Sequence, residues 1–208
     1  MISRDPSPFA PIPGTVPAPR GLFVDRWGTL LQTPEAGFAR SADDVEFSSG
    51  AVDALFRASQ AGWCIYLLGN EDAVARGQVS DAAWQEIDAR VLEGLGAGGV
   101  RIARDYTCLD HPTEGVPGHQ KDSVYLLPNT GAFYHAAHED GIELRKSWVV
   151  GDSSLELVAG WRAGLRQAGV RTGLAVGDGT FKVTPDVLGS DLSDVVLGLL
   201  ELEGALHP

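Results

Sequence analysis

Two short apolar runs, each followed by an aspartate, most constrain what this chain can fold into. Residues 21–24 run into Asp25, and residues 148–150 are followed by Gly151 and Asp152. An apolar run of this length that stops at Asp or Gly is typical of a buried parallel strand. Open α/β sheets place their sites at the carboxyl ends of such strands. We therefore expect Asp25 and Asp152 to converge at one edge of a sheet.

Further strands and helices alternate along the chain between and after these two runs. Ser80 suits the N-cap of a helix, and Gly62 suits the end of one. Repeated βα alternation favours an α/β fold, a Rossmann-like three-layer sandwich with a mainly parallel sheet. The pattern predicts helices over 50–61, 80–95 and 131–140 and after Asp152, strands over 63–68, 100–103 and 168–171, a polar loop over 105–123 and an apolar C-terminal run over 195–202.

Length and proline content indicate one domain with an N-terminal tail. A chain of 208 residues with 44% hydrophobic content can bury one α/β core. Residues 1–20 hold six of its twelve prolines, which suit neither a helix nor a central strand. We predict a proline-rich tail over 1–20 and a domain over 21–208.

The charge and the cysteines exclude several classes of partner and suggest a compartment. A net charge of −12 would repel nucleic acids and anionic membranes. Cys64 lies in an apolar run and Cys108 in the expected polar loop, so a disulfide has no support. Neither a membrane-spanning run nor a signal-peptide pattern is present. We expect a cytoplasmic protein, and its oligomeric state stays open.

The two strand-end aspartates could share a metal ion. Mg²⁺ prefers carboxylate and water oxygens together with substrate phosphate, and a pair at one sheet edge offers such ligands. The alternative is that Asp25 and Asp152 only cap turns or helices. Their paired placement favours the metal site.

Residues 23–30, FVDRWGTL, resemble the first motif, hhDxDGT, of the haloacid dehalogenase superfamily of phosphatases. The resemblance is closest to the branch with heptose bisphosphate and histidinol phosphatases, whose first motif reads DRDGT and whose second segment reads TNQSGIARG. Residues 69–77 read GNEDAVARG. The match continues in family order to about residue 200. It implies a haloacid dehalogenase-like fold with a minimal cap.

The resemblance also implies a role for several residues of this chain. Asp25 would attack phosphorus to form an aspartyl-phosphate, and Lys121 would neutralise charge on the phosphoryl group. Asp152, Asp25 and the carbonyl of Trp27 would bind Mg²⁺. The second segment would contact substrate through three residues: Gly69, Asn70 and Arg76.

Four of the family's functional groups are replaced in this chain. Trp27 stands where an Asp protonates the leaving alcohol and later activates water, work commonly worth about 10²- to 10⁴-fold in rate. Gly69 replaces a Ser or Thr whose hydroxyl binds the phosphoryl group. Glu156 replaces a second metal-site Asp, which is a mild change because Glu can still ligate or support a metal. Gln120 replaces an Arg expected to grip substrate, which weakens any inference about sugar specificity.

The family's zinc loop is altered as well. Its four ligand positions correspond here to Cys108, Asp110, Pro117 and His119, and proline cannot bind a metal. Cys108, His111 and His119 could form an improvised site, although loop histidines are more often simply solvent-facing. We expect no structural zinc.

These observations lead to three hypotheses about function. The first is a Mg²⁺-dependent phosphatase of a small phosphorylated metabolite, with impaired or altered activity. The second is a catalytically inactive pseudo-phosphatase that acts as a binding or scaffold protein. The third is hydrolysis at carbon, because haloacid dehalogenases place a Tyr at the position of Trp27. The contexts of Arg26 and Asp152 favour a phosphatase over the third.

Overall fold

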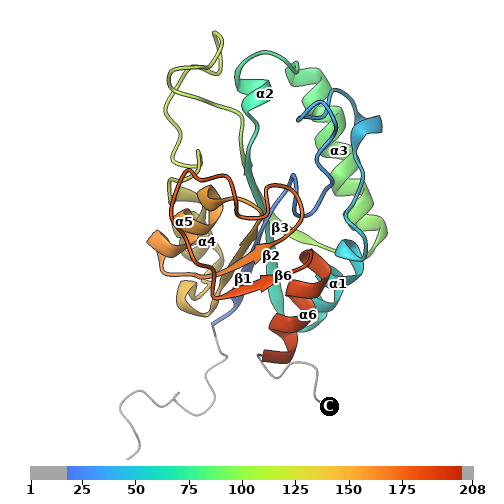
Figure 1. Cartoon of the computed structure of the whole chain (residues 1–208), viewed down its shortest axis with the longest axis vertical. Coiled ribbons are helices and arrows are strands. Elements are labelled where there is room, and N and C mark those ends of the chain that lie inside the picture. The colour runs from blue at the N-terminus through green and yellow to red at the C-terminus, as the bar shows by residue number, and fades with distance from the viewer. Residues whose placement is uncertain (1–17, 203–208) are drawn as a thin grey trace, which may run out of the picture.

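The computed structural model describes residues 18–202, which form a six-stranded parallel sheet between two layers of helices (Figure 1). The predicted proline-rich tail lies almost entirely outside the described residues, as do residues 203–208. The strands run in the order β3-β2-β1-β4-β5-β6. Their bounds are Arg20–Asp25 (β1), Trp63–Asn70 (β2), Ile102–Cys108 (β3), Trp148–Gly151 (β4), Arg166–Val170 (β5) and Val187–Gly189 (β6).

The helices cover both faces of the sheet and complete the predicted three-layer α/β sandwich. Buried residues of α1, α3 and α6 share one apolar cluster with the sheet, and those of α4 and α5 share a second. Their bounds are Ala51–Gln60 (α1), Asp72–Ala75 (α2), Asp81–Ala97 (α3), Gly131–Asp140 (α4), Ser154–Ala163 (α5) and Leu192–Leu202 (α6), with 3-10 turns at Ala42–Asp44 (η1) and Leu144–Lys146 (η2).

Strand β1 divides the two apolar clusters and sits where the strand order changes direction. Leu22 and Val24 enter the cluster beneath α1 and α6, whereas Phe23 enters the cluster beneath α4 and α5. Successive side chains of a strand point to opposite faces, so a fully apolar run suits a strand that is covered on both sides. The chain proceeds from β1 outward to β3 and then returns to place β4 on the other side of β1. Such a switch point opens a crevice at the carboxyl ends of the two strands.

The third strand differs from its prediction in position and length. It spans Ile102–Cys108 instead of 100–103, so Cys108 is buried at a strand end and does not lie in a polar loop. The reason is its place at the edge of the sheet, where Arg104 can remain half-exposed and pair with Asp140. Polar residues therefore interrupt the apolar pattern that identified the other strands. Two short elements, α2 and β6, were not predicted.

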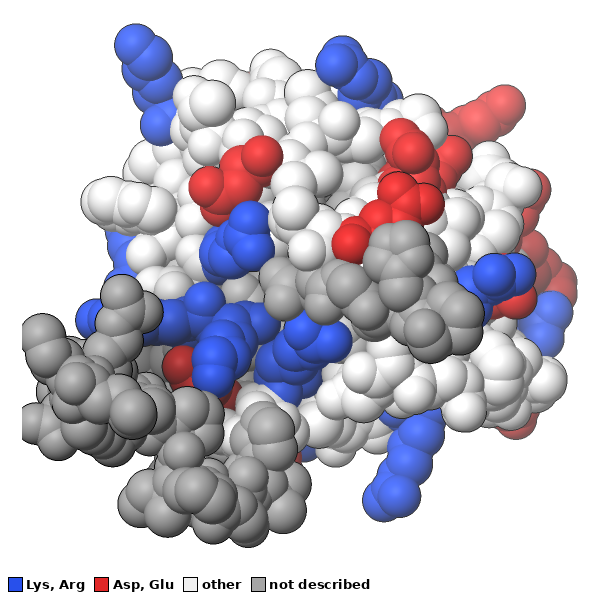
Figure 2. Space-filling model, turned by 90° about the horizontal axis from the view of Figure 1, so that it is seen from below, with Lys and Arg blue, Asp and Glu red and all other residues white. Residues whose placement is uncertain are grey.

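The charged surface is mixed on the face shown in Figure 2, where Lys and Arg side chains gather among Asp and Glu. Two arginines that begin strands are used within the fold. Arg20 stacks over Trp63 at 4.3 Å and Arg166 stacks over Trp148 at 4.0 Å, which are favourable cation–π distances. Within residues 18–202, every helix is too short or too polar to span a membrane.

Candidate active site

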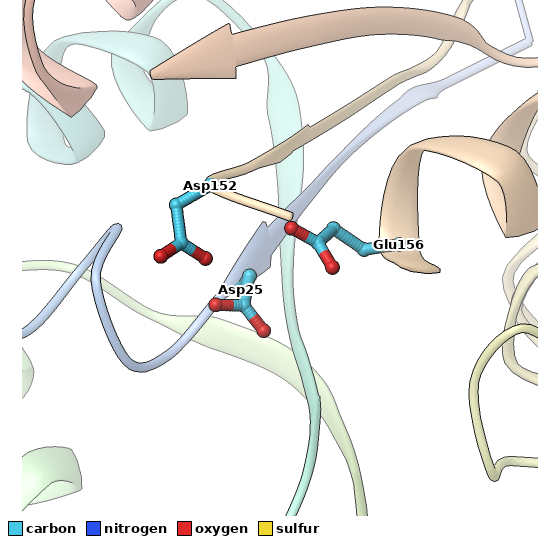
Figure 3. A group of neighbouring side chains, drawn as sticks. All are labelled: Asp25, Asp152 and Glu156. Atoms are coloured by element: carbon cyan, nitrogen blue, oxygen red, sulfur yellow. The ribbon is translucent and has the colours of Figure 1, made fainter. Parts of the chain in front are cut away.

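Three carboxylates converge at the switch point between β1 and β4 (Figure 3). Asp25 ends β1, Asp152 follows β4, and Glu156 lies in the first turn of α5; one oxygen of each lies within 4.8 Å of the others. The three residues are 9%, 5% and 2% exposed. The predicted convergence of Asp25 and Asp152 is confirmed, and Glu156 joins them.

A tight turn directly after β1 positions Asp25. The Leu30 N–H donates to the carbonyl of Asp25 at 3.2 Å, and the Leu31 N–H donates to the carbonyl of Arg26 at 2.7 Å. Gly28 has a φ of +80° inside this turn, a conformation that glycine adopts at little cost. Because the turn folds back on the strand end, the Asp25 side chain faces the crevice and not the core.

Arg26 anchors the same turn through its buried side chain. Its side chain is fully buried and pairs with Asp88 of α3 and Asp105 of β3, and its Nε donates to Thr107 at 2.8 Å. Burial of a guanidinium without partners would be strongly unfavourable, so these contacts fix where the chain leaves β1. Arg26 therefore ties the residue after Asp25 to β3 and α3.

Asp152 is held by the backbone of the segment after β5. The Leu174 N–H donates to Asp152 Oδ2 at 2.7 Å. A Cβ atom at Gly28 or Gly173 would overlap this same oxygen. The two glycines therefore leave the space that the Asp152 carboxylate occupies, and they have positive φ values of +80° and +56°.

Glu156 closes the N-terminus of α5 while facing the other carboxylates. Its side chain accepts from the Ser153 backbone N–H and from Ser153 Oγ at 2.6 Å, a capping box. A carboxylate offers about four lone-pair positions, so Glu156 keeps acceptor capacity toward the site. Its carboxylate is thereby oriented before any ion binds.

The electrostatics of the three carboxylates favour a bound cation. Burial, followed by the charges of Glu156, Asp152 and Glu71, raises the pKa of Asp25 well above its ordinary value. Burial raises the pKa of Asp152 to about 6 and that of Glu156 to about 7. Three buried, mutually repelling carboxylates with oxygen ligands alone form the kind of donor set that Mg²⁺ takes. These residues therefore fit the magnesium ion expected from the sequence.

Trp27 lines the crevice and is bonded to an acidic residue that the sequence analysis did not select. Its Nε1–H donates to Glu71 Oε1 at 2.6 Å. Glu71 is buried beside the site, and burial raises its pKa to about 7. The available signal was its position in the segment 69–77, where the resembled motif has Gln.

The three expected substrate residues all line the same crevice as Asp25. Gly69 lies at the end of β2, where a Cβ atom would be 3.2 Å from Asp25 Oδ1. The Asn70 side chain donates to the Leu127 carbonyl at 3.1 Å and accepts from its N–H at 2.8 Å. Arg76 pairs with Glu114 at 2.7 Å and with Asp72 at 3.2 Å. Asn70 and Arg76 thus make contacts within the protein.

The structure does not bring Lys121 to the carboxylates. Its side chain is 61% exposed, and its ammonium lies 3.4 Å from Asp110 Oδ1. Lys121 is not among the described residues that line the crevice. The neighbouring loop is held by His119, which lies 2.8 Å from Asp81 and 3.2 Å from Asp110. Asp110 therefore contacts both His119 and Lys121.

The crevice is a cleft of about 590 Å³ with an unusual balance of charge. Five carboxylates line it, and Arg76 is its only Lys or Arg among residues 18–202. Its apolar lining comes from Trp27, Phe38, Ala73, Leu127, Leu155 and Leu174.

Known proteins resemble this chain over almost its whole described length, although no family model matches it. The D-glycero-β-D-manno-heptose-1,7-bisphosphate 7-phosphatase of Haemophilus ducreyi is 30% identical over 180 residues, 85% of this chain and 96% of the relative. A D-glycero-D-manno-heptose-1,7-bisphosphate 7-phosphatase of Thermosynechococcus vestitus is 30% identical over 84% of this chain and 92% of the relative.

A solved structure shares both the fold and the sequence pattern. The D,D-heptose 1,7-bisphosphate phosphatase of B. bronchiseptica, complexed with magnesium and phosphate, has a TM-score of 0.76 and 25% identity, covering 88% of this chain and 99% of that one. Together with the identities above, this likeness shows that the chain belongs to the heptose bisphosphate phosphatase family of the haloacid dehalogenase superfamily.

Proposed function

We propose that this protein is a Mg²⁺-dependent phosphatase of a small phosphorylated metabolite that works through an aspartyl-phosphate on Asp25. The observation that carries this proposal is the buried cluster of Asp25, Asp152 and Glu156 that lines the cleft. The relatives named above are phosphatases, and one was solved with magnesium and phosphate. Their reaction is therefore the first to test on this chain.

The charges of the cleft support a requirement for Mg²⁺. A phosphate monoester brings negative charge toward five carboxylates and one arginine that is already paired. Asp25, Asp152 and the carbonyl of Trp27 are the proposed ligands, with Glu156 beside them. A bound Mg²⁺ would offset the negative charge that these groups and the phosphoryl group share. Without it, repulsion would keep the ester away from the Asp25 carboxylate.

Asp25 is the proposed nucleophile because the turn after β1 fixes its carboxylate at the switch point. One of its oxygens would bond to phosphorus while the ester bond breaks, and water would later release phosphate. Backbone N–H groups of the turn and of the second segment would bind the phosphoryl oxygens. The role of Lys121 requires its ammonium to leave Asp110 and approach Asp25.

The leaving group receives no proton from residue 27, since an indole N–H is not an acid at neutral pH and is bonded to Glu71. General acid catalysis commonly contributes about 10²- to 10⁴-fold. We therefore infer an activity that is impaired or altered relative to a phosphatase with Asp at this position. Gly69 removes one further hydrogen-bond donor to the phosphoryl group.

A second candidate function is a catalytically inactive phosphate-binding protein. The observations that favour it are Trp27 at the acid position and Lys121 paired with Asp110 outside the cleft lining. Such a protein would retain Mg²⁺ and anion binding without turnover.

Hydrolysis of 4-nitrophenyl phosphate with Mg²⁺ separates the two functions, because this leaving group needs little protonation. We expect turnover by the wild type, a loss of at least about 10³-fold in Asp25→Asn, as for removal of a nucleophile, and little change in the control Asp53→Asn. Asp53 is exposed on α1, outside the described cleft lining, and pairs with Arg57. Inert wild-type protein that still binds both Mg²⁺ and inorganic phosphate would establish the second function.

A further inference from the structure

We propose that the cleft selects phosphate monoesters of aromatic alcohols with a single phosphate, and not sugar bisphosphates. This inference rests on the proposed phosphatase function and names its substrate class. The relatives are named for a heptose bisphosphate, a polar substrate with two phosphoryl groups. Three independent features of this cleft differ from what such a substrate needs.

The first feature is that, among the described residues, the lining offers no unpaired cation for a second phosphate. Arg76 is the only Lys or Arg in the described lining, and both Asp72 and Glu114 already bind it. The carboxylates of Glu71 and Asp72 line the same space. A second dianionic phosphate beyond the reaction site would meet carboxylates without a free cation, so its binding would be unfavourable.

The second feature is that several hydrogen-bonding side chains of the lining are already engaged within the protein, which leaves mainly Thr33 and Gln78 for sugar hydroxyls. Both ends of the Asn70 amide are used by the Leu127 backbone. Ser153 Oγ is bonded to Glu156, and Glu71 Oε1 accepts from Trp27. A buried sugar hydroxyl that finds no partner loses affinity, because it gives up its water without compensation.

The third feature is an aromatic and aliphatic wall beside the carboxylates. Trp27 lies two residues after the nucleophile, and its ring is held in the wall by Glu71. Phe38 and Leu127 line the same cleft, with Leu155 and Leu174 on the side of α5 and the segment after β5. Rings prefer to stack on or meet the edges of other rings, which favours a planar apolar alcohol in this space.

The chemistry of the leaving group agrees with the shape of the cleft. A phenol has a pKa of about 10, like the tyrosine side chain, whereas the pKa of an alkyl alcohol is far higher and close to that of water. A phenolate can leave with the electron pair of the broken P–O bond and then take a proton from solvent. Asp25 forms the new bond to phosphorus. Water next bonds to phosphorus, the bond to Asp25 breaks, and both water protons stay on the released phosphate.

The test compares kcat/KM in Mg²⁺ for three esters, which are phenyl phosphate, cyclohexyl phosphate and fructose 1,6-bisphosphate, and for the mixed anhydride acetyl phosphate. We expect phenyl phosphate to exceed cyclohexyl phosphate and the bisphosphate by about 100-fold or more, in line with a general acid that is missing. Acetyl phosphate has an activated but small leaving group, so it isolates the contribution of the ring.

A variant of the wall checks that the preference comes from the cleft. Phe38→Ala is expected to lower about tenfold the ratio of kcat/KM for phenyl phosphate to kcat/KM for acetyl phosphate. A tenfold change corresponds to the loss of one aromatic contact. Phe56→Ala, in a half-exposed position on α1, is the matched control and should keep the wild-type ratio.

The outcomes separate this inference from the function on which it rests. Faster turnover of fructose 1,6-bisphosphate than of phenyl phosphate would overturn the substrate class and leave the phosphatase function intact. An unchanged phenyl-to-acetyl ratio in Phe38→Ala would also overturn it. Failure to hydrolyse any of the four compounds would instead reject the phosphatase function itself.

Discussion

The indole N–H of Trp27 donates a hydrogen bond to the buried Glu71 carboxylate at 2.6 Å. These residues lie 44 positions apart, one after β1 and the other after β2, and both line the cleft that contains Asp25. Trp27 stands where the family's first motif has an acidic residue. The bond therefore fixes an aromatic ring, and not a proton donor, beside the proposed leaving group.

Replacing Trp27 by an acid should change which esters the protein hydrolyses. In Trp27→Asp we expect kcat for cyclohexyl phosphate to rise at least about tenfold relative to phenyl phosphate, because protonation matters most for a poor leaving group. Steady-state rates of the two esters measure this ratio. Trp27→Asn has the same size without an ionisable proton and is the matched control. Equal ratios in the two variants would rule out acid catalysis as the cause.

The pKa values predict how stability and Mg²⁺ binding depend on pH. Burial raises the pKa values of Glu71 and Glu156 to about 7 and that of Asp152 to about 6. A carboxyl group with a raised native pKa binds more protons in the folded than in the unfolded state. Without metal, the contribution of these groups to the free energy of unfolding should therefore be greatest below about pH 4. It should fall as pH rises toward 7.

Glu71 alone would account for a loss of roughly 3 kcal/mol between pH 4 and 8, from a pKa change of 4.5 to about 7. Glu71→Gln should therefore show a shallower loss, which urea unfolding at several pH values would measure. The proposed Mg²⁺ site requires Asp152 to be deprotonated, so the stabilisation that Mg²⁺ gives should grow from pH 5 to pH 8. A Mg²⁺ effect that is equal at both pH values, or equal in Asp152→Asn, would contradict the assigned site.

Gly69 illustrates a position where restoring the family's residue should not help. Its φ is +150°, and a Cβ atom would lie 3.2 Å from Asp25 Oδ1. We expect Gly69→Ser to lower the free energy of unfolding by about 1 to 3 kcal/mol through backbone strain. Because the added atoms also press on Asp25, turnover of 4-nitrophenyl phosphate should fall.

The control for Gly69 is Gly62→Ser. Gly62 has a φ of +84° and no atom within 4 Å of an added Cβ, so it tests strain alone. Urea unfolding should show similar destabilisation in both variants, with activity reduced only in Gly69→Ser. A gain of activity in Gly69→Ser would show that the missing hydroxyl, and not the backbone, limits the site.

The central strands and the two aspartates could be predicted because buried parallel strands are continuous apolar runs. β1 ends at Asp25 and β4 at Gly151, where their apolar runs stop, whereas β2 continues two residues past its run to Asn70. β3 was misplaced because an edge strand tolerates Arg104 and Asp105, which break the pattern. The three residues of β6 are too few to form a pattern.

The contacts that define the site could not be predicted from local sequence. The bond between Trp27 and Glu71 depends on how two separate loops meet at the sheet edge. The pairing of Lys121 with Asp110 depends on how the loop after β3 folds back on itself. Motif order placed Lys121 in the site, yet the structure shows its ammonium on another carboxylate. Glu156 was identified from the resemblance, as the replacement for the family's second metal-site Asp, and the structure places it in the first turn of α5.

The most direct measurement of the central claim is a rapid-quench experiment with 4-nitrophenyl phosphate and Mg²⁺. Since Trp27 cannot activate water, release of phosphate from Asp25 should be slower than its phosphorylation. We predict a burst of about one nitrophenolate per protein and a phosphoryl group on the peptide that contains Asp25, both absent in Asp25→Asn. Equal rates in the two proteins, or nitrophenolate release without phosphorylation of Asp25, would contradict the account.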